Sequence, residues 1–361
     1  MHPPEGSRVL IAMSGGVDSA AAATLLRNQG YECLGVTLRL VPDHPATSPF
    51  EPCCGLEAAE DARRVCERIG IPHRILHAVD FFDGEIISDF LAEYQRGRTP
   101  NPCIRCNLAV KFGRLYELAD TLNAPYIAMG HYARLEQHQG RWTLRRAVCR
   151  PKDQSYVLAP LSQEQLSRAL FPLGDMTKEE SRAAVRHIDY VSSAKRESQE
   201  ICFVPDRDYG GFIERRLGKL ATPGSIISTT GEVLGRHRGL IHYTIGQRRG
   251  LGIGASGPYY VLRLDTTTNT LIAGHRPETL QTRFTTGPIR WGGTAPQQTP
   301  LEVQVQLHSR HQAVPGTLEP SPDRARIHLH TPQSSITPGQ WAVCYTEDRV
   351  AASAIVETVE E

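Results

Sequence analysis

The sequence predicts an α/β protein in which a parallel-sheet domain is followed by a small central β-rich domain and a C-terminal β-barrel-like domain. Strand-like and helix-like segments alternate from the N-terminus to about residue 130, which is typical of a parallel sheet. From about Gly224, short β-like runs are separated by Gly, Pro and Asn turns. A length of 361 residues suits two or three domains, which we place at 1–205, 206–291 and 292–361.

The N-terminal elements follow from apolar runs and from helical spacing of apolar residues. We predict strands at 9–13, 31–40, 73–79 and 125–129. We predict helices at 20–26, 56–69, 83–94 and 107–122. Such repeated strand–helix units imply a sheet covered by helices on both faces, with ligands bound at the carboxyl ends of the strands.

The second half of the chain begins with helical signals and then becomes β-like. Ser162 with Gln165, and Thr177 with Glu180, have the spacing of capping boxes at helix starts. The segment 292–300, rich in Gly, Thr, Pro and Gln, is predicted to be a linker. The β-like runs are predicted at 225–228, 259–264, 271–273, 301–307, 325–330 and 340–345.

The composition is globular, with 40% hydrophobic and 22% charged residues. Forty Lys and Arg nearly balance 39 Asp and Glu, which excludes a histone-like polycation, yet residues 206–290 hold 12 basic and 6 acidic residues. This local excess fits either a polyanionic partner or an ordinary solvated surface. No apolar run approaches the ~20 residues of a membrane span, and nine cysteines do not suggest a secreted disulfide framework. We therefore expect a cytoplasmic protein without a membrane segment or signal peptide.

The string Ser14-Gly15-Gly16-Val17-Asp18-Ser19 lies between the first predicted strand and helix. Its glycines allow a close backbone approach, and the helix N-terminus and the two serine hydroxyls offer groups that bind an anion such as pyrophosphate. No Gly-Lys-Ser/Thr follows, so it is not a Walker A loop. A purely structural turn is the alternative for a glycine-rich loop taken by itself. We expect Asp18 to assist Mg²⁺, the alternative being a helix N-cap.

Cysteine spacing marks a second candidate site. Cys103 and Cys106 have C-x-x-C spacing, which suits a redox pair or two ligands of a zinc or iron–sulfur site, or else two inert loop thiols. We expect Cys106 to lie at the start of the helix that begins near Asn107, where the helix dipole favours a thiolate. Cys202 is a third candidate, although by itself it is more typical of a core thiol. The remaining six are interpreted as structural: Cys33, Cys53, Cys54, Cys66, Cys149 and Cys344.

Three further polar strings are candidates for nucleotide or RNA contact. Gly130 and His131 follow a predicted strand at the ligand edge, where His131 is either an acid, base or donor or an ordinary loop histidine. Arg248 and Arg249 lie on a glycine-rich turn within the basic middle and suit RNA phosphates and unpaired bases. The third string is either a solvated turn or a phosphate or ribose contact, through Lys152, Gln154 and Tyr156.

The strand–SGGVDS–helix string resembles the PP-loop of ATP pyrophosphatases, and the chain as a whole resembles the bacterial tRNA-uridine 2-sulfurtransferase (2-thiouridylase) family. The likeness extends from about Val9 to Val356. The family's strings occur in the family's order: AMSGGVDS (12–19), TPNPCIRCN (99–107), GHYAR (130–134), KDQSY (152–156), ESQEICF (197–203), YTIGQRRGLGI (243–253) and TPGQWAVCY (337–345).

The resemblance implies ATP-dependent thiolation of uridine 34, the wobble position, in the tRNAs for Lys, Glu and Gln. In the family, ATP with Mg²⁺ adenylates the uracil C2 oxygen, giving AMP and pyrophosphate. Sulfur arrives as a persulfide on the cysteine matched by Cys202, from a donor such as a cysteine desulfurase or a sulfur relay protein. The cysteine matched by Cys106 is the family's nucleophile and forms a disulfide with Cys202 as sulfur leaves. A base inside a stack cannot be reached, so the uridine should be flipped out.

The family's contact residues transfer onto this chain position by position. Nucleotide contacts fall on Leu38, Gly130 and the eight residues Ala12, Met13, Ser14, Gly15, Gly16, Val17, Asp18 and Ser19. Target-base contacts fall on Asn101, Pro102 and Cys103. Other tRNA contacts fall on His131, Lys152, Asp153, Gln154, Arg310 and Gln340, to which the basic turn adds Arg248 and Arg249.

Three departures from the family pattern matter. Many members have Asp where this chain has Cys103, the Arg-Tyr-Arg string reads His308-Ser309-Arg310, and Ala351-Ala352-Ser353 replaces a glycine-rich string. Cys103 leaves two routes open. In the favoured route Cys202 carries a persulfide that Cys106 resolves, with Cys103 an onlooker. In the other, all three thiolates ligate a [4Fe–4S] cluster whose open iron binds sulfide.

Two rival functions predict different features. Another PP-loop enzyme, such as a nucleotide amidotransferase or argininosuccinate synthetase, needs no pair of active cysteines. A non-catalytic RNA-binding module with structural zinc needs no intact ATP loop. The sequence has both the loop and the cysteines, which favours the sulfurtransferase interpretation.

Overall fold

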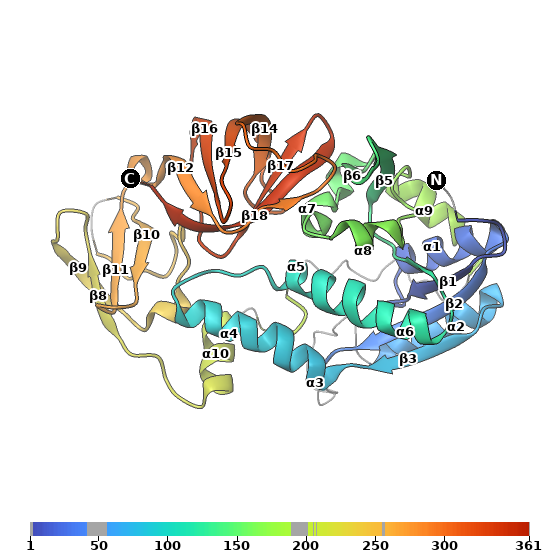
Figure 1. The fold of residues 1–361 in the computed structure, drawn as a ribbon. Coiled ribbons are helices and arrows are strands. Elements are labelled where there is room, and N and C mark those ends of the chain that lie inside the picture. The colour runs from blue at the N-terminus through green and yellow to red at the C-terminus, as the bar shows by residue number, and fades with distance from the viewer. Residues whose placement is uncertain are drawn as a thin grey trace.

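A computed structural model describes residues 3–41, 56–188, 201–204, 206, 208–254 and 257–360 (Figure 1). Cys53, Cys54 and the segment 197–200 of the ESQEICF string lie outside the described residues. In the described part of the chain, no helix is long and apolar enough to cross a membrane.

The N-terminal domain is built on a five-stranded sheet in the order β3-β2-β1-β4-β7, in which every pair is parallel. Its strands are β1 (Arg8–Ala12), β2 (Glu32–Arg39), β3 (His73–His77), β4 (Tyr126–Ala128) and β7 (Ala169–Leu170). The predicted strands and their parallel arrangement are confirmed, whereas β7 was not predicted because two residues give no periodic signal.

Helices cover both faces of this sheet because alternate residues of β1 point to opposite sides. Val9 and Ile11 pack with α1 (Val17–Asn28) and α2 (Leu56–Ile69). Leu10 packs in a second core with two long helical segments. The first consists of α3 (Val79–Phe82), the π-helical turn η1 (Asp83–Ile87) and α4 (Ser88–Gln95). The second consists of α5 (Pro102–Cys106), η2 (Asn107–Arg114) and α6 (Leu115–Thr121).

The second long helical segment begins earlier than the sequence predicts. The predicted start at Asn107 is wrong, because α5 begins at Pro102. The Asn101 side chain caps it by accepting a hydrogen bond from the Ile104 N–H at 3.2 Å, and proline suits the first helical position. The two cysteines therefore lie on a helix and not in a loop before it.

The smaller helical pieces lie mainly between β6 and the central domain. Both predicted capping boxes are confirmed, Ser162 with Gln165 at α8 and Thr177 with Glu180 at α9. The short helices are η3 (Arg150–Lys152), α7 (Ser155–Leu158), α8 (Gln163–Ser167), α9 (Lys178–Ala184), α10 (Tyr209–Leu217), η4 (Leu240–His242) and η5 (Arg276–Thr279).

A four-stranded sheet in the order β10-β11-β8-β9 forms the central domain around a small apolar core that includes Ile226, Val261 and Leu271. Its strands are β8 (Gly224–Ile227), β9 (Val233–His237), β10 (Tyr260–Asp265) and β11 (Thr270–Gly274). β9 was not predicted from the sequence, since it carries Gly and two charged or polar residues among its five.

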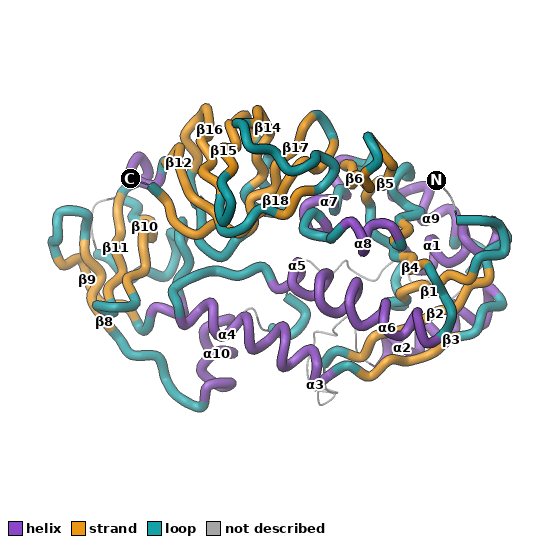
Figure 2. The backbone as a smooth tube through the Cα atoms, in the orientation of Figure 1, coloured by secondary structure: helices purple, strands orange, loops and turns teal. Residues whose placement is uncertain are grey.

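The C-terminal domain is a closed barrel, because β12 pairs with β16 on one side and with β18 on the other, which joins the strand order β12-β16-β15-β14-β17-β18 into a ring (Figure 2). The predicted β-barrel-like domain is thus confirmed. Its strands are β12 (Gln281–Thr286), β13 (Arg290–Trp291), β14 (Leu301–Gln306), β15 (Val314–Pro320), β16 (Ala325–Gln333), β17 (Trp341–Thr346) and β18 (Arg349–Val359). The segment 292–300 joins β13 to β14 within this sheet, so strands from 281 onward belong to it.

The barrel also receives a hairpin from the N-terminal domain. β5 (Ala133–His138) and β6 (Arg141–Arg146) extend its sheet through pairing of β6 with β18. Asp348 accepts hydrogen bonds from Arg134 at 2.6 Å and Arg145 at 2.8 Å. The departure at 351–353 does not interrupt β18, where all three small side chains are buried. Shared strands and ion pairs thus fix the barrel against the N-terminal domain.

Candidate functional site

The SGGVDS string forms the turn from β1 into α1, at the carboxyl edge of the parallel sheet. Gly15 has a φ of +70°, and a Cβ there would lie 2.7 Å from the Ala58 carbonyl oxygen of α2. Gly16 is the N-cap of α1, with no side-chain cap. The alternative of Asp18 as an N-cap is therefore wrong, and the helix leaves its first N–H groups without a capping side chain.

Two serines organise this turn internally. The Ser19 hydroxyl accepts a hydrogen bond from the Ser14 N–H at 3.2 Å and donates to the Gly16 carbonyl at 3.0 Å. The two hydroxyl oxygens lie 3.2 Å apart, and Ser19 is buried. In this structure the Ser19 hydroxyl thus helps to shape the turn.

Asp18 makes an ion pair that the sequence did not predict. Lys178, the first residue of α9, places its Nζ 2.7 and 2.8 Å from the two carboxylate oxygens, and the Tyr132 hydroxyl donates to Oδ1 at 2.8 Å. Lys178 is buried, with 8% of its side chain exposed. Burial and the bond to Asp18 raise the pKa of Tyr132 above its ordinary value. The only sequence signal for Lys178 is its place directly after the Thr177 capping residue.

Gly130 packs directly against the turn, and Leu38 lies in the core of the same domain. A Cβ on Gly130 would lie 2.7–2.8 Å from backbone atoms of Asp18 and Ser19. Glycine at this position therefore allows the backbone to pack directly against the turn. Leu38, near the end of β2, is buried in the core. Ala12 ends β1, and the Met13 N–H donates to Val36 of β2 at 2.8 Å.

The turn fits the phosphates of ATP better than it fits a metal ion bound by the protein. A glycine-rich strand–helix turn directs N–H groups toward a ligand, and Lys178 adds a cation beside it. No group of three His, Cys, Asp or Glu within the described ranges is placed to hold a metal ion. Mg²⁺ in nucleotide enzymes is held largely by substrate phosphates and water, and Asp18 is the carboxylate at hand.

His131 lies beside this edge with its ring against Phe171, at a centroid distance of 6.3 Å. Its Nδ1 is shielded from solvent and has no hydrogen-bond partner. Burial, reinforced by the Lys111 cation, lowers the pKa of His131 well below its ordinary value. The imidazole is therefore neutral near pH 7 and suits a hydrogen-bonding role more than phosphate pairing.

The KDQSY string is largely structural. Asp153 accepts hydrogen bonds from the Ala147 N–H at 2.9 Å and the Ser155 hydroxyl at 2.8 Å. Gln154 accepts from the Tyr132 N–H at 3.0 Å through its side-chain oxygen. The expected ligand contact of Tyr156 is wrong, because its ring is buried and its hydroxyl donates to the Trp341 carbonyl at 2.9 Å. Lys152 ends the short helix η3.

The cysteine helix α5 presents its two thiols differently. Cys103 is exposed near the helix N-terminus, whereas Cys106 is buried at the fifth helical position. The expectation that the helix start activates Cys106 is therefore wrong, since the dipole acts mainly within the first turn. Asn101 is the cap and Pro102 is buried, so this part of the string sets the helix start.

Cys202 and Cys106 lie in the same hydrophobic core. Cys106 is a buried member of this core. Cys202, which precedes Phe203 in the chain, is half-buried and packs against the core. Phe203 stacks edge-on with Phe82 and Phe90 of the first long helix, at 5.8 and 5.2 Å. Across the described residues no three cysteines form a metal-ligating group, so the structure does not support the cluster ligand set of Cys103, Cys106 and Cys202.

The other described cysteines behave as packing groups. Burial raises the pKa of Cys33 to about 11 and those of Cys66 and Cys344 to about 12. Cys66 packs so closely on β2 that a Cβ on Gly35 would lie 2.5 Å from its Sγ. Cys149 is half-buried. The raised pKa values make Cys33, Cys66 and Cys344 poor nucleophiles near neutral pH.

The expected RNA-contact residues outside the N-terminal domain fall into two kinds. Arg248, Arg249 and Arg310 are exposed, the first two on a turn between Gly246 and Gly250, which have φ values of +84° and +78°. Gln340 instead donates from its Nε2 to the carbonyl oxygens of Thr99 and Pro100, at 2.9 and 3.1 Å. It thus contacts the segment that leads to the cysteines.

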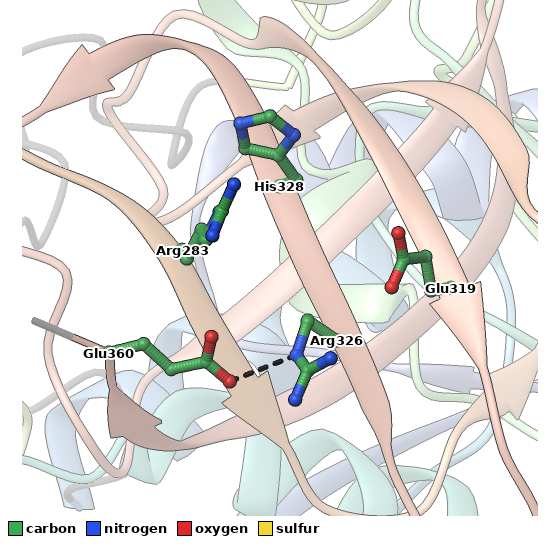
Figure 3. A pocket seen from close by; sticks show the side chains of 5 residues that line it. All are labelled: Arg283, Glu319, Arg326, His328 and Glu360. Carbon is green, nitrogen blue, oxygen red and sulfur yellow. Dashed lines mark hydrogen bonds and ion pairs between the residues drawn. The ribbon is translucent and has the colours of Figure 1, made fainter.

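A cavity of about 250 Å³ lies on the barrel and not at either candidate site (Figure 3). Two cations there face two carboxylates, with Arg326 and Glu360 paired at 3.0 Å. None of its lining residues was predicted as a site residue: Arg283, Glu319, Arg326, His328 and Glu360.

Family models follow the domain order of this architecture. Three family models match in succession: the tRNA methyl transferase HUP domain at residues 7–206, the tRNA methyl transferase PRC-barrel domain at 210–275 and the aminomethyltransferase β-barrel domain at 281–356. A solved 4-thiouridine synthetase–RNA complex with bound ATP aligns with 56% of this chain and 46% of its own, at 18% identity and a TM-score of 0.34.

Curated relatives match nearly end to end. The tRNA-specific 2-thiouridylase MnmA of Acetivibrio thermocellus is 40% identical, over 97% of this chain and 99% of its own. The enzymes of that name from Pelotomaculum thermopropionicum and Syntrophotalea carbinolica are 42% and 43% identical, over 98% and 96% of this chain and 98% and 97% of their own. With its loop, cysteine helix and three domains in the same order, the chain belongs to the tRNA-specific 2-thiouridylase family.

Proposed function

We propose that this protein uses ATP and Mg²⁺ to convert uridine 34 of the tRNAs for Lys, Glu and Gln into 2-thiouridine. One observation carries the proposal. The N-terminal domain holds both a strand–SGGVDS–helix turn, with the buried Lys178 beside it, and a separate helix that carries two cysteines. Family membership supports formation of 2-thiouridine in tRNA. The tRNA range, the adenylate and the persulfide are the finer parts of the proposal.

In the activation half, the turn at 14–19 holds the phosphates of ATP through backbone N–H groups and the α1 N-terminus. The uracil C2 oxygen attacks the α-phosphate, pyrophosphate leaves, and the oxygen becomes part of an AMP leaving group. Lys178 and Asp18 form a nearly neutral pair beside the turn, which lets the site accept charged phosphates without a free carboxylate repelling them. Mg²⁺ supplies charge neutralisation of the phosphates when it is bound with ATP.

In the sulfur half, the terminal sulfur of a Cys202 persulfide bonds to C2 and AMP departs. The Cys106 thiolate then attacks the inner sulfur of Cys202, and the electrons of the broken S–S bond remain on the sulfur now attached to the base. The products are 2-thiouridine and a Cys106–Cys202 disulfide, which a cellular thiol reductant reopens. Shared packing of both cysteines on one core supports their encounter. Cys103, exposed on α5, is an auxiliary thiol at the target-base side.

RNA contacts are proposed along the exposed basic turn and the cysteine segment. Arg248 and Arg249 contact phosphates, with Arg310 on the barrel. Asn101 and Pro102 lie beside the flipped base, while His131 and Lys152 face the RNA near the ATP site. The persulfide comes from a cysteine desulfurase or a sulfur relay protein. We propose cytoplasmic localisation and three functional units, in which the strands at 281–291 belong with the barrel in which they pair.

The test is mass spectrometry of tRNA nucleosides after incubation with ATP and a persulfide donor, with pyrophosphate release measured in parallel. We expect the parent enzyme to produce 2-thiouridine at position 34. Asp18→Ala should reduce pyrophosphate release and thiolation together by roughly 100-fold or more, because an electrostatic group at the activation site is lost. Cys202→Ser should retain pyrophosphate release and abolish thiolation. A folded Asp18→Ala enzyme with full pyrophosphate release would contradict the activation half, and a thiolating Cys202→Ser enzyme the sulfur half.

A further inference from the structure

The residues 96–101, here called the approach segment, join α4 to α5 and lead directly to the reactive cysteines. They form neither helix nor strand, so their backbone polar groups need partners from elsewhere. At its end Asn101 caps α5, which carries Cys103 and Cys106. The conformation of this segment therefore sets where the cysteine helix begins.

The N–H groups of Arg96, Gly97 and Arg98 donate to carbonyls of α4, whereas the C-terminal barrel supplies the partners of Thr99 and Pro100. The Thr99 N–H donates to the Pro338 carbonyl at 2.9 Å. The Gln340 Nε2 donates to the carbonyls of Thr99 and Pro100, at 2.9 and 3.1 Å. One turn of the barrel, more than 230 residues away in sequence, thus pairs three backbone groups just before the cysteine helix.

The barrel turn is itself held firmly. Gly339 has a φ of +92°, and a Cβ there would lie 2.9–3.0 Å from the Thr99 backbone, so the two chains pack at backbone contact. The Gly339 N–H donates to the Val356 carbonyl at 2.9 Å, and the Val356 N–H donates to the Gln340 carbonyl at 2.8 Å. Because β18 anchors the turn, the Gln340 amide is presented from a rigid element.

Charge and the central domain complete the contact. Arg98 donates to Glu93 of α4 at 2.7 Å and to Glu357 of β18 at 3.2 Å. A Cβ on Gly97 would lie 3.0 Å from the Thr266 side chain beside β10. The approach segment is therefore contacted by all three domains, and Figure 1 shows it passing between α4 and the strands of the barrel.

We propose, resting on the proposed function above, that Gln340 is a positioning residue for the cysteine helix and not a donor to tRNA phosphates. Both of its amide protons point to backbone carbonyls of the approach segment, which leaves no N–H for a phosphate or a base. Through Thr99, Pro100 and the Asn101 cap, the barrel fixes the placement of Cys106. A barrel displaced by RNA would displace the cysteine helix with it.

The test compares Gln340→Ala and Gln340→Glu with a matched control, Gln304→Ala, on an exposed position of β14. We expect Gln340→Ala to lower kcat for thiolation by roughly 10- to 100-fold, the range for misplaced reacting groups, with unchanged tRNA Kd and pyrophosphate release. Gln340→Glu should lose at least as much, since its isosteric carboxylate faces two carbonyl oxygens. Gln304→Ala should match the parent in every measurement.

A second readout needs no turnover. The alkylation rate of Cys106, measured by peptide mass spectrometry without tRNA or ATP, should rise several-fold in Gln340→Ala because the buried thiol is released, while the melting temperature stays near that of the parent. A raised tRNA Kd with unchanged kcat and alkylation would overturn the proposal in favour of an RNA contact. Parent-like kcat and alkylation would overturn it outright. A parent enzyme that forms no 2-thiouridine would instead refute the proposed function.

Discussion

The nucleotide turn and the cysteine helix are organised in opposite ways. The turn at 14–19 is a contiguous string held by its own hydrogen bonds and by α2, Gly130 and Lys178 of the same domain. The cysteine helix depends on an approach segment that the central domain and the barrel hold in place. The candidate nucleotide turn is therefore built within one domain, whereas the placement of the cysteine helix depends on how three domains are packed together.

Among the variants that test this contrast, we expect the largest effect from a substitution of Lys178. Lys178→Met leaves the partly buried Asp18 carboxylate with only Tyr132 as a partner. Removing one member of a buried ion pair costs about 3–5 kcal/mol, and because Asp18 is one-third exposed we expect about 2–3 kcal/mol. The loss should be seen as faster hydrogen exchange in α1 and α9, together with reduced pyrophosphate release.

The same variant also tests whether the two halves are independent. If the activation site is self-contained, the alkylation rate of Cys106 in Lys178→Met should equal that of the parent. Lys178→Arg is the charge-conserving control and should keep most of the stability. Unchanged hydrogen exchange together with full pyrophosphate release in Lys178→Met would show that the ion pair has no such role.

A smaller effect is expected on the RNA side. Replacing Arg248 and Arg249 together by Ala should weaken tRNA binding and flatten its dependence on salt by about one or two units of slope, since each phosphate contact contributes about one. Filter binding at several salt concentrations measures this. Because these exposed arginines lie outside both sites, kcat at saturating tRNA should not change. A parent-like salt slope would place the RNA surface elsewhere.

The features that the sequence could predict are the local ones, as in the nucleotide turn, and not those that depend on contacts between domains. The parallel sheet, the turn at 14–19 and the capping boxes at Ser162 and Thr177 could be predicted, because apolar spacing and capping chemistry act over a few residues. The β12 strand, QTRFTT, and the β15 strand, VPGTLEP, could not, since polar residues or prolines hide their alternation.

At the candidate sites, the partners that the sequence did not predict are mainly residues far apart in the chain. Lys178 lies 160 residues from Asp18, and Gln340 lies 240 residues from Pro100, so no local pattern connects them. The helix start was misplaced because the pair Asn101–Pro102 was not recognised as a cap followed by proline, which marks a helix start. The burial of Tyr156 could not be predicted, because the polar residues around it in the sequence indicate an exposed segment.

The smallest effect expected is a pH dependence of stability at His131, on the nucleotide side. Burial, with Lys111 adding to it, lowers the folded-state pKa of His131 well below its ordinary value. The unfolded chain takes up a proton near pH 6.5, while the folded protein does not until much lower pH. The stabilisation is therefore complete above about pH 6.5 and is lost as pH falls below it, with a slope of up to about 1.4 kcal/mol per pH unit. The test follows hydrogen exchange of β4 and α1 between pH 7 and pH 5 in the parent and in His131→Asn. The free energy of unfolding should fall less steeply with falling pH in the variant, because the uptake of one proton on unfolding is lost. An identical slope would mean that the imidazole is solvated and that this edge of the nucleotide site is more open than its geometry indicates.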